Sequence, residues 1–171
     1  LTLDGVMQAP GGPGEDDAGG FAHGGWSVNY WDDVMATVMT ESFSAPFELL
    51  LGRRTYDIFA GYWPDAPEEE GAKVFNEATK YVASRSRPTL EWSNAVLIEG
   101  DAAEGVAKLK EQDGPELQVH GSATLLQTLI GAGVVDEFRV WVFPLVLGKG
   151  KRLFGDGTVP EGLELVDAKV S

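Results

Sequence analysis

The stretch Leu49-Leu50-Leu51-Gly52-Arg53-Arg54-Thr55-Tyr56 decides the fold of this chain. Its apolar part predicts a buried strand over 47–51, Gly52 ends that strand, and a helix is expected over 53–60. A helix that starts directly after a strand points its free backbone N–H groups beyond the strand end, where they favour an anion. This junction is therefore a candidate anion-binding site.

The distribution of charge draws attention to the same junction. Residues 1–52 contain eight acidic residues and no Lys or Arg, so Arg53 and Arg54 are the first positive charges in the chain. Arginine at a helix N-terminus opposes the helix dipole, which favours a ligand-binding role over an ordinary solvent-facing turn.

A second stretch, Leu117-Gln118-Val119-His120-Gly121-Ser122-Ala123-Thr124-Leu125-Leu126, repeats the order of strand, glycine and helix. Two such junctions in one sheet predict a nucleotide whose phosphates bridge two helix starts.

Composition limits the class of protein. The 171 residues are 43% hydrophobic, which is typical of one globular domain with one core. No apolar run approaches the roughly 18–20 residues that a membrane span needs, and no basic-then-apolar leader is seen, so a cytoplasmic protein is expected. The absence of cysteine excludes disulfides and thiolate chemistry. His23 and His120 are too far apart to suggest a metal site.

The formal charge of −14 argues against nucleic acid or an anionic membrane as partner, because both need a basic face. An anionic small molecule would have to be held by local donors, since the overall field repels it.

The remaining chain alternates between strand and helix patterns. Between them, Gln8–Gly25 holds seven glycines and two prolines in eighteen residues, which predicts a mobile loop anchored by Phe21 and Trp26. The alternation predicts an α/β domain with a mostly parallel sheet and antiparallel strands near the C-terminus. Strands are expected over 1–7, 47–51, 80–84, 96–98, 117–120, 137–147 and 162–170, and helices over 27–44, 53–60, 68–78, 102–111 and 122–131.

Five short motifs occur in an order that resembles the dihydrofolate reductase-like superfamily, and most closely its branch of RibD C-terminal domains. They are Leu3-Asp4-Gly5-Val6, Leu51-Gly52-Arg53-Arg54-Thr55-Tyr56, Val82-Ala83-Ser84-Arg85, Val119-His120-Gly121-Ser122 and Pro144-Leu145-Val146-Leu147-Gly148-Lys149-Gly150-Lys151-Arg152-Leu153-Phe154.

The resemblance implies one three-layer domain over 1–171, with a central mostly parallel sheet, an antiparallel C-terminal hairpin and helices on both faces. Leu1 would fall late in the first strand and the last strand would follow Ser171, so the chain is expected to lack both of those pieces.

The resemblance also implies NADPH as cofactor. Gly52 to Thr55 would meet its phosphates, with Arg53 or Arg54 directed at the 2′-phosphate, and Ser84 with Arg85 would complete that pocket. The other cofactor-binding residues implied are Gly121, Ser122, Ala123, Thr124 and Leu125 beside the pyrophosphate, and Met7 and Gln8 beside the nicotinamide.

Several of these residues have a structural alternative. Asp4 and Asp32 are the candidate catalytic carboxylates, but Asp4 with Gly5 is also a turn signal, and an acid at a helix start such as Asp32 is stabilising by default. Ser84 and Arg85 could simply end a strand, and Ser122 could be an ordinary N-cap.

The function implied is an NADPH-dependent reductase that transfers a hydride to a small heterocyclic or carbonyl/imine substrate, with the 8–25 loop as its lid. The alternatives are a nucleotide-binding protein without turnover and a true dihydrofolate reductase, although the complete folate-site pattern is not seen. Successive large apolar residues in 137–147, together with the resemblance, predict a homodimer near that hairpin.

Overall fold

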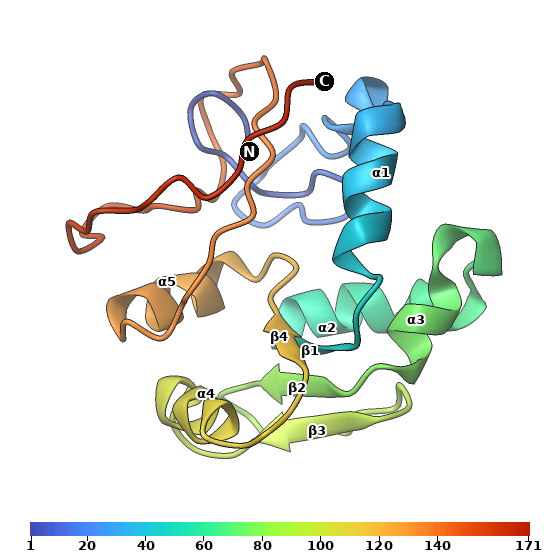
Figure 1. Ribbon diagram of the computed structural model, residues 1–171, viewed down its shortest axis with the longest axis vertical. Helices are drawn as coiled ribbons and strands as arrows, with labels where there is room; N and C mark the ends of the chain where they lie inside the picture. The colour runs from blue at the N-terminus through green and yellow to red at the C-terminus, as the bar shows by residue number, and fades with distance from the viewer. The chain divides into compact units, whose positions relative to one another are not determined.

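Strand β1 (Phe47–Gly52) forms where the apolar run predicted it, in a computed structural model that describes the backbone of residues 1–171 and every side chain except that of Glu69 (Figure 1). Leu49 and Leu51 are fully buried, and Leu50 is 1% exposed. Parallel partners lie on both edges of β1: β2 (Lys80–Ala83) and β4 (Glu116–Gln118).

The sheet has four strands in the order β3-β2-β1-β4, and β3 (Ala95–Ile98) pairs in parallel with β2. Parallel neighbours need crossover connections. The described residues between β2 and β3 form no helix, whereas helices follow β1, β3 and β4. These helices are α2 (Arg53–Ala60) and α3 (Ala72–Glu77) after β1, α4 (Ala102–Lys110) after β3, and α5 (Ala123–Gly131) after β4. The predicted parallel α/β arrangement is confirmed.

Helices cover both faces of this sheet. Successive side chains of β1 alternate between the faces, so both faces present apolar side chains that have to be covered. On one face Leu50 packs with Ile98, with Val106 of α4 and with Leu129 of α5. On the other face, the Phe47 ring meets the Phe75 ring of α3 edge-on, with centroids 6.0 Å apart. The result is the predicted layering of helix, sheet and helix (Figure 1).

Lys80, the first residue of β2, is completely buried. Its Nζ donates to the Asn76 carbonyl oxygen (2.6 Å) and the Ser93 carbonyl oxygen (3.1 Å), and lies 4.2 Å from the centre of the Trp92 ring. Burial lowers the pKa of the ammonium to about 8. The lysine therefore connects the end of α3 with the segment that leads into β3.

The chain divides into two compact units. Residues 46–136 are continuous and contain the sheet, whereas the other unit combines 1–45 with 137–171. The discontinuous unit contains helix α1 (Asp33–Ser42) and a short 3-10 helix, Val28–Tyr30. Its two segments meet through isolated bridges, parallel between Thr2 and Phe143 and antiparallel between Val6 and Arg152.

The strands predicted over 1–7, 137–147 and 162–170, and with them the antiparallel C-terminal hairpin, are wrong for the structure as described. Beyond those two bridges, the described residues of 137–171 pair with no strand. A strand needs a neighbour for its backbone groups, and the apolar pattern reports side-chain faces without specifying that neighbour. Val142 and Leu165 are accordingly 63% and 81% exposed.

Two predicted helices are shorter than expected. The helix predicted over 27–44 begins only at Asp33, because Asp32 is extended and its carboxylate accepts from the Met35 N–H (2.9 Å) as an N-cap. The helix predicted over 68–78 is divided by Gly71, whose φ of +91° is left-handed, into a 3-10 helix (Glu68–Glu70) and α3.

The loop predicted to be mobile has more internal ties than its sequence suggested. Gln8 is 5% exposed, and its Nε2 donates to the carbonyl oxygens of Asp16 (3.1 Å) and Ala18 (3.0 Å). Its backbone carbonyl accepts from the Trp26 ring N–H (2.8 Å). The Gln8 side-chain amide thus holds the start of the loop to its middle, and the Gln8 backbone carbonyl holds it to the residue that follows the loop.

Among the described residues, no helix combines the length and the apolar character needed to cross a bilayer.

Candidate functional site

The two strand-to-helix junctions singled out from the sequence lie against each other. Strands β1 and β4 are parallel neighbours, so their carboxyl ends reach the same edge of the sheet. There the Gly52 backbone N–H donates to the Ser122 Oγ (2.7 Å), and the Ser122 hydroxyl donates to the Thr55 Oγ1 (2.8 Å). One serine hydroxyl therefore connects the starts of α2 and α5.

An unusual backbone directs this hydroxyl toward the other junction. Gly121 has a φ of +84°, and Ser122 follows with φ 68° and ψ 57°, so two successive residues are left-handed. Such a conformation costs a non-glycine residue about 1–2 kcal/mol. Ser122 occupies the N-cap position of α5 but makes no side-chain cap bond, so the alternative of an ordinary serine cap is not what the structure shows.

Glycine at position 121 leaves space between the junctions. A Cβ built on Gly121 would point toward Thr55, whose Cγ2 would be 4.0 Å away. At Gly52 the space is filled instead, because a Cβ there would be 3.1 Å from both Cβ and Oγ of Ser122. The two glycines therefore differ: Gly121 leaves space on the side of Thr55, and Gly52 permits the close approach of Ser122.

The first turn of α5 offers mainly backbone donors. The Leu125 side chain is 7% exposed and belongs to the core cluster with Leu129, so it has no free face for a ligand. Ala123 is half-buried and Thr124 is exposed. Of the residues predicted in this turn, Thr124 alone presents a polar side chain to solvent.

Arginines predicted to bind the 2′-phosphate lie near the same edge. Arg53 Nε donates to both carboxylate oxygens of Asp57, at 2.7 and 2.9 Å, within α2. Arg85 is exposed and follows β2 by two residues, and the strand's last residue, Ala83, is the register partner of Gly52. Ser84 Oγ accepts from the Ser86 N–H (3.2 Å), which forms a tight turn around Arg85. Arg54 is also exposed at the start of α2.

Asp4, a candidate catalytic residue, lies in the other unit and holds a loop. Its carboxylate accepts from the Thr2 hydroxyl (2.6 Å) and from the backbone N–H groups of Leu147 (3.2 Å) and Gly148 (2.7 Å). The Thr2 hydroxyl and these two N–H groups lower the pKa of Asp4 to about 2, against the desolvation that raises it. The side chain is therefore ionised at neutral pH.

Asp32, Met7 and Gln8 also lie in the discontinuous unit. Asp32 caps α1, the structural alternative that the sequence allowed, and the Met7 N–H donates to the Lys151 carbonyl oxygen (2.8 Å). The structure therefore brings together Gly52, Thr55 and Ser122 directly. That Met7 and Gln8 border a nicotinamide stays a prediction, as does a catalytic part for Asp4 or Asp32.

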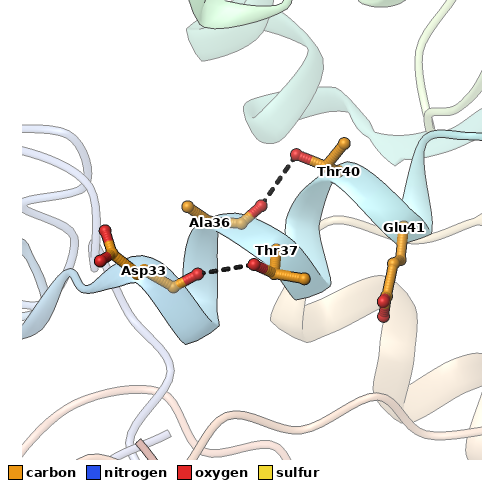
Figure 2. Close-up of a pocket in the computed structure, with 5 residues that line it drawn as sticks. All are labelled: Asp33, Ala36, Thr37, Thr40 and Glu41. Atoms are coloured by element: carbon orange, nitrogen blue, oxygen red, sulfur yellow. Dashed lines mark hydrogen bonds between the residues drawn. The ribbon is translucent and has the colours of Figure 1, made fainter.

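A shallow hollow on the surface of α1 contains none of the junction residues (Figure 2). The Thr37 and Thr40 hydroxyls donate to the carbonyl oxygens of Asp33 (2.8 Å) and Ala36 (2.9 Å) in the preceding turn, as the dashed lines in Figure 2 show. Glu41 pairs with Lys169 (2.8 Å). The two hydroxyls and the Glu41 carboxylate therefore already have partners, and we interpret the hollow as an open helix face.

Two contacts at the junctions were not predicted from the sequence. His120 bonds through Nε2 to the Gln118 Oε1 (2.9 Å) and lies against the Phe75 ring. The bond from Gly52 to Ser122 was missed, because residues 70 positions apart give no local signal. Among the described residues, no group of three or more His, Cys, Asp or Glu side chains could hold a metal ion.

Known proteins resemble this chain along its length. It is 36% identical over 125 residues to the uncharacterized protein YyaP of Bacillus subtilis (strain 168), a match that covers 71% of this chain and 66% of YyaP. It is 28% identical over 141 residues to the uncharacterized protein YwjB of the same organism, covering 82% of this chain and 72% of YwjB.

A solved structure shows the same fold. The crystal structure of a "putative riboflavin biosynthesis protein" from Shewanella sp. PV-4 matches with a TM-score of 0.67 and 20% identity, covering 99% of this chain and 88% of that one. The family model of the RibD C-terminal domain matches residues 1–171. The order of motifs, the parallel sheet with its paired junctions and this match agree: the chain belongs to the RibD C-terminal domain family.

Proposed function

We propose that this protein is an NADPH-dependent reductase that transfers a hydride to a small heterocyclic or carbonyl/imine substrate. Membership of the RibD C-terminal domain family supports a reductase-type fold. The observation that carries the proposal is the Ser122 hydroxyl bond to Gly52 and Thr55, which holds two helix starts together at the carboxyl edge of the sheet. This is where open α/β sheets bind nucleotides.

The residues at this edge fit a dinucleotide phosphate. The first turns of α2 and α5 supply backbone N–H groups that have no acceptor within the helix, and Thr55 adds a hydroxyl between them. Gly121 leaves the approach open on the side of Thr55. Because the chain carries a formal charge of −14, such local donors have to outweigh the long-range repulsion of an anion.

The 2′-phosphate would be bound at the ends of β1 and β2. Arg85 is exposed there, and Arg53, which pairs with Asp57, and Arg54 begin α2. A guanidinium matches a phosphate with two parallel N–H bonds, which gives selectivity for NADPH over NADH. We therefore assign the 2′-phosphate to Arg85, together with Arg53 or Arg54.

NADPH, when bound, supplies the hydride, and the protein's residues bind and orient it and keep water out. Met7 and Gln8 remain our candidates beside the nicotinamide. Asp4 and Asp32 remain the candidate carboxylates, and Asp4, ionised at neutral pH, would accept a hydrogen bond or a proton and would not donate one. The proposal includes a cytoplasmic location and a homodimer.

Fluorescence titration with NADPH and NADH tests the cofactor. We expect NADPH to bind about 10- to 100-fold more tightly, the effect of one charged phosphate contact. Arg85→Ala should weaken NADPH and leave NADH unchanged. Arg87→Ala is the matched control, because Arg87 pairs with Glu99 (3.2 Å). Equal dissociation constants for the two cofactors would refute the assignment.

Oxidation of NADPH, followed by absorbance against a panel of heterocyclic, carbonyl and imine substrates, tests the reaction. Turnover of at least one substrate is expected. Binding without any turnover would instead support a nucleotide-binding protein of the same fold, and turnover confined to dihydrofolate would support a dihydrofolate reductase.

A further inference from the structure

The hydrogen bonds at the junction use up the donors of two residues that were expected to meet phosphate. A serine hydroxyl has one proton, and a backbone amide has one. The Ser122 proton is given to the Thr55 Oγ1 (2.8 Å), and the Gly52 N–H is given to the Ser122 Oγ (2.7 Å). An anion needs donors, and in this arrangement neither the Ser122 hydroxyl nor the Gly52 N–H is left to bind one.

Thr55 is in the opposite situation. Its Oγ1 accepts the Ser122 proton, so that bond leaves the proton of Thr55 itself available. Thr55 is half-buried in the first turn of α2, among the N–H groups that have no partner within the helix. A hydroxyl that already accepts one hydrogen bond is polarised and becomes a stronger donor in the next.

We infer that Ser122 is a positioning residue, which orients and polarises the Thr55 hydroxyl, and that Thr55 is the side chain that donates to the cofactor's pyrophosphate. The inference rests on the proposed function, and it removes the Ser122 hydroxyl and the Gly52 N–H from the direct phosphate ligands that the sequence predicted.

The local backbone is shaped for this bond on both sides. Ser122 takes up a left-handed conformation, and with it gives up the side-chain bond that would cap α5. On the facing strand, Gly52 is extended with φ −71°, so its conformation does not require glycine. The close approach does, because a Cβ would be 3.1 Å from Ser122 Oγ.

A double-mutant cycle on NADPH affinity tests the inference. Thr55→Val removes the proposed donor at nearly constant volume, and we expect binding about 2- to 10-fold weaker. Ser122→Gly removes the hydroxyl in a residue that tolerates the left-handed backbone, and should weaken binding by a similar or smaller factor. In the Thr55→Val background, Ser122→Gly should then have little further effect.

Two further variants keep the result interpretable. Thr55→Ser retains the hydroxyl, so it should bind NADPH nearly as the parent does and stay sensitive to Ser122→Gly. Ser122→Ala replaces Ser122→Gly in the cycle if the glycine variant does not fold, as judged by circular dichroism. The same coupling is expected with NADH, because both cofactors share the pyrophosphate, whereas Arg85→Ala affects NADPH alone.

The outcomes separate the two proposals. If the losses from Thr55→Val and Ser122→Gly multiply in the double variant, Ser122 acts independently of Thr55 and the positioning role is overturned while NADPH binding stands. If Thr55→Val binds like the parent, Thr55 is not the donor and the inference is equally overturned. If the folded parent binds neither NADPH nor NADH, the proposed function fails and this inference fails with it.

Discussion

Gln8 and Lys151 lie 143 positions apart in the sequence, and the Lys151 backbone N–H donates to the Gln8 side-chain oxygen over 3.0 Å. The Lys151 ammonium pairs in turn with the Asp16 carboxylate at 2.6 Å, and the Gln8 amide holds the Asp16 carbonyl oxygen. The loop 8–25 and the segment 147–152 are therefore fastened to each other through the same three residues.

Gln8→Ala should loosen both segments together. The side chain is buried and makes three hydrogen bonds, so its loss leaves buried groups unpaired and should cost about 1–3 kcal/mol of unfolding free energy. Hydrogen exchange should become faster in 9–25 and in 147–152. Gln112→Ala is the control, because that exposed amide bonds only weakly, at 3.3 Å, to the Lys108 carbonyl oxygen. Faster exchange confined to 9–25 would show that the segments are independent.

Asp4→Asn should change how the free energy of unfolding depends on pH in the acid range. The folded-state pKa of about 2 lies below the ordinary 3.8, so the unfolded chain binds more protons between those values. The carboxylate's contribution is thus complete above about pH 4 and is lost as the pH falls toward 2. Urea midpoints of parent and variant should differ at pH 5 and converge near pH 2. Asp113→Asn, in an exposed turn, should leave the profile unchanged. A difference between parent and Asp4→Asn that is constant with pH would contradict this assignment.

Lys80→Met should remove a rise in the free energy of unfolding at alkaline pH. Burial lowers the pKa of Lys80 from 10.5 to about 8, so the unfolded chain binds more protons between about pH 8 and pH 10.5. The parent should therefore become more stable across that window, by an amount on the order of 2 kcal/mol. Urea unfolding at pH 7.5, 9 and 10.5 should show this rise in the parent and in Lys73→Met, whose lysine is exposed, but not in Lys80→Met. A parallel rise in Lys80→Met would assign the effect to other groups.

Gly52→Ala and Gly121→Ala should destabilise for different reasons. Gly121→Ala has room but keeps a φ of +84°, which costs about 1–2 kcal/mol. Gly52→Ala has an ordinary φ but crowds Ser122, at a cost of about 1–3 kcal/mol. Ser122→Gly should therefore recover much of the loss in Gly52→Ala and none of the loss in Gly121→Ala. Urea denaturation of the two double variants checks this, and equal recovery in both would refute it.

The predicted homodimer should be detected by light scattering at micromolar concentration, as about twice the chain mass. Exposed apolar side chains in 137–171 motivate the prediction, among them Val142 and Val146 at 63% and 66% exposure. A stable twofold interface buries about 1,200–2,000 Å² in total. Val142→Asp should shift the protein toward monomer, whereas Val74→Asp, on α3, should not. A monomeric parent at that concentration would reject the dimer.

The sequence predicted the sheet unit well because its signals are local. Leu49 to Leu51 form an apolar run, Gly52 ends it, and the same order recurs before Ala123, so the elements around both junctions were identified to within a few residues. The sequence also allowed Asp32 to be an acid that stabilises a helix start. The structure agrees, since its carboxylate accepts from the N–H three residues later.

What the sequence could not predict depends on distant partners. Apolar residues also suggested a strand over 137–147, where the described residues pair only through the isolated bridge between Phe143 and Thr2. Nothing in a Gly- and Pro-rich segment marked Gln8 as its central anchor. Likewise the bond between Gly52 and Ser122 spans 70 positions, so the sequence indicated two junctions but not the hydroxyl that connects them.

The discontinuous unit has a consequence for synthesis on the ribosome. Thr2 meets Phe143, Asp4 meets Leu147 and Gly148, and Val6 meets Arg152, while the whole of 46–136 is translated between these partners. The sheet unit can therefore fold while the apolar side chains of the segment before it stay uncovered, until residues 143–152 have been translated. Residues 2–6 are thus translated before the sheet unit but gain these partners only after it has been made.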